Sequence, residues 1–89
     1  SGAVGIVETY SLASALSAAD AAAKAAPVSL LEVRLGTGIG GKGFVTLVGD
    51  TAAVTAAVAA GARTASSKGL LVATAVIPAP APEVRDELI

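Results

Sequence analysis

The sequence predicts a mixed α/β (α+β) fold of the ferredoxin-like type, an antiparallel sheet with two helices on one face. Two observations carry this prediction. Four short segments are rich in the β-branched residues that favour strands. Two longer segments are dominated by alanine, the strongest helix former, and each stands between two strand segments. The resulting order is β-α-β-β-α-β, and we expect residues 1–89 to form a single domain.

In the first half of the chain, residues 3–8 (AVGIVE) have the short β-branched composition of a buried strand. Residues 11–26 are dense in helix formers, and Pro27 ends the predicted helix. Residues 28–35 (VSLLEVRL) form the second predicted strand. The glycine-rich segment 36–43 follows it, so this segment is expected to connect the second strand to the third.

In the second half, residues 44–48 (FVTLV) predict the third strand. Asp50 stands at a plausible N-cap position for a second alanine-rich helix over residues 51–67. Residues 70–77 (LLVATAVI) predict the fourth strand. A proline-rich stretch then leads to the acidic residues 83–89, for which we expect a short C-terminal helix or tail.

Alanine supplies 22 of the 89 residues, so the core must be built largely from small side chains. Burying an alanine methyl group contributes about 0.8 kcal/mol, against roughly 1.5–3 kcal/mol for a valine or leucine side chain. Such a core leaves a monomer marginally stable, and oligomerisation is one usual remedy.

The composition also excludes several classes of function. The net charge is −1 and the six basic residues are scattered, so no surface for nucleic acid is expected. The chain has neither cysteine nor histidine, which removes disulfides, thiolate or imidazole metal sites and the usual general base. Glu8 and Asp50 could form a carboxylate pair, but each is predicted at a helix start, where capping explains it. We expect no enzyme activity, no metal and no cofactor.

No signal peptide is visible, because the first residues lack a basic region and Glu8 interrupts the opening apolar run. The longest apolar helical stretch, residues 52–62, is mostly alanine and is too short to cross a bilayer. We therefore expect a cytoplasmic protein that does not bind membranes.

The segment GTGIGGKG at 36–43 fits seven positions of the phosphate-binding pattern G-x-x-x-x-G-K-[ST], through Gly36, Gly41 and Lys42. The eighth position, which needs a hydroxyl group for Mg²⁺, is Gly43. A strand-like segment follows where the pattern requires a helix, so we do not expect a nucleotide site. A plain glycine hairpin is the simplest alternative, but two to five residues usually suffice for one.

Three segments together resemble the bacterial microcompartment shell domain: VETYSLASALSAADAAAKAA, GIGGKGFVTLVGD and VIPAP. The resemblance covers residues 3–82. It implies flat cyclic hexamers that tile edge to edge into the shell of a polyhedral organelle, together with other shell proteins and around encapsulated enzymes. It also implies that the loop between the second and third strands lines a central pore for small metabolites. The pore-lining residues would then be Gly38, Ile39, Gly40, Gly41, Lys42 and Gly43.

Two residues match the hexamer edge of this family. Lys24 corresponds to the lysine at the edge, although by itself it would be interpreted as a solvated lysine near a helix C-terminus. Ala79 stands in IPAP where the family commonly has an arginine, in IPRP, that joins neighbouring hexamers. This departure implies weaker lateral tiling.

Within the family, the chain most resembles the second domain of the tandem-domain, iron–sulfur-binding shell protein of propanediol-utilising compartments. That domain has a cysteine after GIGGK, where this chain has Gly43, so no cluster ligand is inherited. Because the chain is expected to form one domain, a hexamer of single domains is expected in place of a trimer of tandem domains. The alternative is a small ferredoxin-like regulatory module, a dimer or trimer that binds a metabolite at a subunit interface.

Overall fold

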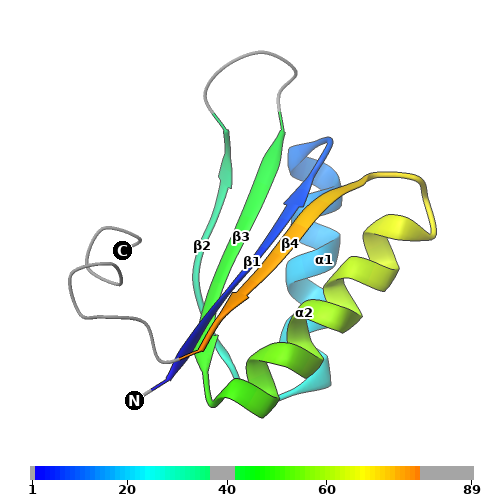
Figure 1. Cartoon of the computed structure of the whole chain (residues 1–89). Helices are drawn as coiled ribbons and strands as arrows, with labels where there is room; N and C mark the ends of the chain where they lie inside the picture. Colours follow the sequence, from blue (N-terminus) through cyan, green and yellow to red (C-terminus); the bar gives the residue numbers. More distant parts are fainter. Residues whose placement is uncertain (1, 37–41, 79–89) are drawn as a thin grey trace.

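The structure is a computed structural model that describes residues 2–36 and 42–78 (Figure 1). These residues form four strands and two helices in the predicted order. Their bounds are β1 Ala3–Thr9, α1 Leu12–Ala25, β2 Ser29–Leu35, β3 Gly43–Gly49, α2 Thr51–Ser66 and β4 Leu71–Ile77. Among them, no helix is long and apolar enough to cross a membrane. The helix or tail expected at residues 83–89 lies outside the described residues.

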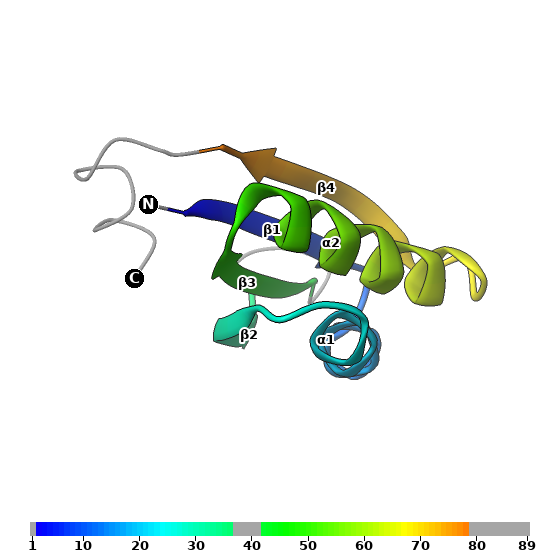
Figure 2. The same ribbon diagram turned by 90° about the horizontal axis from the view of Figure 1, so that it is seen from below.

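The four strands form one sheet in the order β2-β3-β1-β4, and every neighbouring pair is antiparallel. Both helices cover the same face of this sheet, as the view from below shows (Figure 2). The predicted ferredoxin-like arrangement is therefore confirmed. Each element has at least one boundary that differs from the prediction by one residue. At β3 the strand begins at Gly43, because the backbone there pairs with both Leu35 and Thr9, so the strand extends into the glycine-rich segment.

The core lies between the sheet and the two helices, and it consists mainly of alanine and valine side chains. Its buried members are Ala3, Val7, Ala15, Ala18, Ala19, Ala22, Val45, Leu47, Val54, Ala57 and Val58. Gly61 of α2 lies so close to α1 that a Cβ atom there would be 3.0 Å from the Ala18 carbonyl oxygen. The alanine content thus lets α1 and α2 pack side by side on a narrow sheet.

The two helices begin differently. Ser11 caps α1, since its hydroxyl oxygen accepts a hydrogen bond from the Ser14 backbone N–H at 3.1 Å. Asp50 does occupy the N-cap position of α2, but its side chain makes no capping hydrogen bond. The predicted position of this cap is confirmed, and the predicted role of its carboxylate is wrong.

Candidate functional site

The end of β2 and the start of β3, which form the base of a hairpin, lie together at one end of the sheet (Figure 1). Leu35 pairs with Gly43 at its base, and the Gly36 N–H donates a hydrogen bond to the Lys42 carbonyl oxygen at 2.6 Å. Lys42 therefore stands at the base of the hairpin and is partly buried. Four of the residues predicted to line a pore lie outside the described residues: Gly38, Ile39, Gly40 and Gly41.

Gly43 is buried where β3 meets the start of α1. A Cβ atom at this position would lie 2.5 Å from the Ser11 carbonyl oxygen and 2.7 Å from the Ala15 Cβ atom. Packing within a single chain therefore already requires glycine here. That Gly43 lines a pore stays a prediction.

A polar cluster lies next to the hairpin on the sheet face opposite the helices. The Arg34 guanidinium stands over the Phe44 ring, 5.0 Å from its centroid, and its Nε is 3.2 Å from the Glu32 carboxylate. Arg34 and Phe44 are cross-strand partners, so the cation–π contact follows from the register of β2 on β3. Our sequence analysis missed this cluster. The two-residue spacing of Glu32 and Arg34, which places them on one strand face, was the available signal.

At the other end of the domain, Lys24 lies in the last turn of α1. Its Nζ donates a hydrogen bond of 2.8 Å to the Asp20 carboxylate, and the two side chains are 76% and 65% exposed. This hydrogen bond, together with the charge of Asp20, raises the pKa of Lys24 above its usual value. Sequence analysis missed Asp20 as well, although its spacing of four residues from Lys24 is the spacing of a helical ion pair.

Lys42 and Lys24 lie at opposite ends of the domain. Gly43, next to Lys42, packs against the residue that caps the start of α1. Gly49, at the far end of β3, packs against Pro27 and Val28, which follow the end of α1. The seven residues of β3 span about 20 Å, in a domain whose longest dimension is 32 Å. Ala79, the second predicted edge residue, lies outside the described part of the chain.

Glu8 and Asp50 do not form a carboxylate pair, and the prediction that Glu8 stands at a helix start is wrong. Glu8 lies within β1 opposite Phe44, near the hairpin, whereas Asp50 follows Gly49 at the other end of the sheet. Antiparallel pairing of β1 with β3 separates the two carboxylates. In residues 2–36 and 42–78, no group of three acidic, cysteine or histidine side chains is placed to hold a metal ion.

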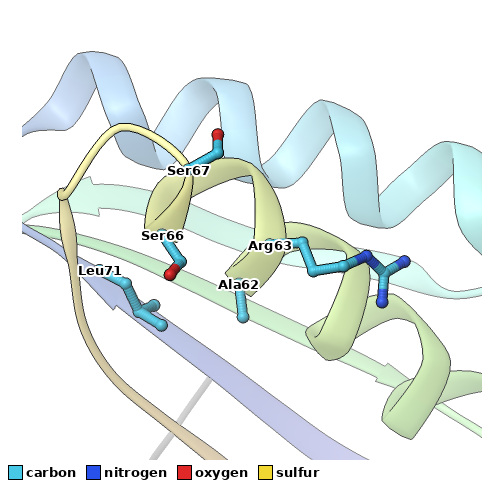
Figure 3. A pocket seen from close by; sticks show the side chains of 5 residues that line it. All are labelled: Ala62, Arg63, Ser66, Ser67 and Leu71. Carbon is cyan, nitrogen blue, oxygen red and sulfur yellow. The ribbon is translucent and has the colours of Figure 1, made fainter.

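A groove of about 540 Å³ lies between the end of α2 and the start of β4. Its lining residues are Ala62, Arg63, Ser66, Ser67 and Leu71 (Figure 3). An arginine and two serines therefore border the groove beside the apolar Ala62 and Leu71. Its lining residues bring together no acid and base that would support catalysis.

Comparison with known proteins identifies the family. The family model of the BMC domain matches residues 3–80. The chain belongs to the BMC domain family. This BMC domain is 49% identical over 78 residues to the bacterial microcompartment shell protein PduT of Citrobacter freundii, an alignment that covers 88% of the chain and 42% of PduT.

Two further relatives differ in how much of their own length this BMC domain covers. The microcompartment shell protein PduA of Salmonella typhimurium is 44% identical over 84 residues, with 92% of the chain and 85% of PduA covered. A solved microcompartment protein of Desulfitobacterium hafniense DCB superposes with a TM-score of 0.88 at 54% identity, covering 94% of the chain and 47% of that structure. The chain thus spans less than half of two relatives and most of the third. The family resemblance inferred from the sequence is confirmed.

Proposed function

We propose that this BMC domain is a structural component of a bacterial microcompartment shell, with no catalytic role. Its copies form cyclic hexamers, the hexamers tile edge to edge with one another and with other shell proteins, and each ring encloses a central pore. The relatives support the shell role, because PduT and PduA are both named as microcompartment shell proteins.

The observation that carries the proposal is the placement of the hairpin and of Lys24 at opposite ends of a thin domain. The domain measures 32 × 27 × 15 Å. Six copies with their hairpins inward would close a flat ring about 60 Å across. In that arrangement Lys42 faces the axis and Lys24 faces the perimeter, which is what a pore residue and an edge residue require.

Exposed apolar side chains support the assembly. The large hydrophobic residues that remain exposed in the described chain are Tyr10, Leu12, Leu16, Leu30 and Leu35. Leu30 and Leu35 belong to the edge strand β2, and Leu12 lies on α1 beside Gly43, the partner of Leu35. Because an alanine-rich core stabilises a monomer weakly, covering these side chains with a neighbouring copy contributes stability that the isolated chain lacks.

We also propose that the pore carries metabolites and holds no iron–sulfur cluster. Gly43 supplies no thiolate, and its packing against Ser11 and Ala15 leaves no room for a side chain. Six Lys42 ammonium groups around one axis would instead make the opening cationic. Neighbouring charges at roughly 10 Å in water repel by only about 0.4 kcal/mol, so such a ring is tolerable and draws anions.

Size-exclusion chromatography with light scattering tests the assembly. We expect a species of six times the 8.4 kDa chain mass at tens of micromolar, which forms sheets visible by negative-stain microscopy when concentrated. A folded monomer would contradict the proposal. A dimer or trimer stabilised by a small metabolite would favour a regulatory module instead.

A further inference from the structure

The first glycine of the glycine-rich segment is required by a neighbouring aromatic ring. Gly36 does not have a positive φ, so its backbone conformation does not call for glycine. An added Cβ atom would instead collide with the Phe44 ring, and it would lie 3.2 Å from the Lys42 carbonyl oxygen. The ring of Phe44 therefore lies over the Gly36 backbone, in the way that aromatic side chains cover glycines near the edge of a sheet.

Arg34 contacts the same ring. Its guanidinium group lies 5.0 Å from the centroid of the Phe44 ring, and its Nε lies 3.2 Å from the Glu32 carboxylate. Both interactions use the planar guanidinium group, which can lie against a ring while its Nε faces a carboxylate. A lysine would carry the same charge without this shape. Arg34 is half-exposed, yet its side chain is held between Glu32 and Phe44.

Lys42 is joined to this group through its backbone. The Gly36 N–H donates a hydrogen bond to the Lys42 carbonyl oxygen at 2.6 Å, next to the Leu35–Gly43 pair at the end of the sheet. Backbone hydrogen bonds at the ends of elements open more easily than those in the middle. Because the Phe44 ring lies over Gly36, it covers this last hydrogen bond from one side.

We propose that Arg34 and Phe44 are positioning residues for Lys42. The planar guanidinium holds the ring over Gly36, the ring keeps the Gly36–Lys42 hydrogen bond closed, and that bond fixes the backbone from which the lysine side chain projects. The inference rests on the proposed function, in which Lys42 sets the anion preference of the pore. It adds that this preference depends on the shape of Arg34 rather than on its charge, which Glu32 balances.

Three variants separate shape from charge. Arg34→Lys keeps the positive charge and removes the planar group, and Phe44→Leu keeps an apolar side chain and removes the ring. Arg63→Lys is the matched control, because Arg63 is an exposed arginine of α2 that has no ion pair or ring contact within the described part of the chain. Light scattering confirms that each variant assembles as the wild type does.

Two measurements follow the positioning. Hydrogen exchange of the Gly36 amide, resolved by nuclear magnetic resonance, reports the hydrogen bond to Lys42 directly. Planar bilayer conductance reports the anion-over-cation permeability ratio. We expect Arg34→Lys and Phe44→Leu to speed the exchange at least about tenfold and to lower the ratio at least about twofold, whereas Arg63→Lys should change neither.

A double-mutant cycle shows whether Arg34 acts through Lys42. When Lys42→Ala is already present, Arg34→Lys should cause no further change in the permeability ratio, because the group that it positions is gone. An equal fall in the ratio with and without Lys42 would overturn the inference, since Arg34 would then act on the ions itself.

Two other results would overturn the inference and leave the pore in place. One is unchanged Gly36 exchange in Arg34→Lys, which would show that the hydrogen bond does not depend on the planar group. The other is faster exchange with an unchanged permeability ratio, which would show that Lys42 needs no positioning. A wild-type hexamer without anion preference would instead contradict the proposed function itself, and the wild-type conductance identifies that case separately.

Discussion

At Gly43 the structural reason for a glycine is close packing within the chain, although the residue stands in a glycine-rich motif. The sequence places it in a phosphate-loop-like run, and the family resemblance places it in a pore. The structure shows that it lets the start of β3 approach the start of α1, where a Cβ atom would meet the Ser11 carbonyl oxygen and the Ala15 side chain. Such a contact depends on two segments that are distant in sequence, so residue patterns alone could not reveal it.

This packing predicts the effect of a substitution at Gly43. Gly43→Ala should lower the free energy of unfolding by about 1–3 kcal/mol, because backbone and side-chain atoms of α1 must move to admit the methyl group. Urea unfolding followed by circular dichroism, at a fixed protein concentration, measures the change.

Gly69→Ala is the control for Gly43→Ala. Gly69 has a φ of +70° and no atom within 4 Å of an added Cβ atom, so only backbone strain of about 1–2 kcal/mol applies. The two substitutions differ in a second readout. Gly43→Ala should also disturb the contact between β3 and α1, seen as faster hydrogen exchange at the start of α1, and Gly69→Ala should not. Equal exchange at that site in the two variants would contradict the packing argument.

At the scale of elements, composition and periodicity predicted every strand and helix of the described chain, with boundaries within about two residues. β-branched runs and alanine runs differ so clearly here that local propensity is sufficient. Pairings between elements were not predictable in the same way. Arg34 meets Phe44, and Glu8 is separated from Asp50, only because of the strand register, which depends on the whole sheet.

The prediction about the pore concerns Lys42, at the base of the β2–β3 hairpin. If its end faces the ring axis, the hexamer should conduct anions in preference to cations, since six Lys42 side chains attract anions. Lys42→Ala should reduce the anion-over-cation permeability ratio at least about threefold. Planar lipid bilayer conductance measures the ratio, and Lys24→Ala serves as the control because it removes the same charge at the opposite end of the domain, in the last turn of α1. An anion preference that survives Lys42→Ala unchanged would place this lysine away from the conduction path.

For the whole molecule, the sequence indicates the family, and the structure shows where the residues of its motifs lie in the domain. The order of motifs identified the BMC domain family, and the family model and relatives agree. The structure adds the placement of those motifs, with Lys42 beside the start of β3 and the Asp20–Lys24 pair near the far end of that strand. Asp20 escaped the sequence analysis because it resembles an ordinary solvated charge until its exposed apolar surroundings are seen.

The central claim is that six domains point the base of the β2–β3 hairpin inward and the C-terminal end of α1 outward. Because the chain contains no cysteine, one engineered cysteine gives one spin label per copy. Pulsed electron paramagnetic resonance on dilute hexamers of Lys42→Cys and of Lys24→Cys measures the spacing of six equivalent labels directly. We expect the shortest separation to fall below about 20 Å at position 42 and to exceed about 25 Å at position 24, as for labels near and far from a six-fold axis. Equal separations at the two positions, or the reverse order, would contradict the proposed arrangement.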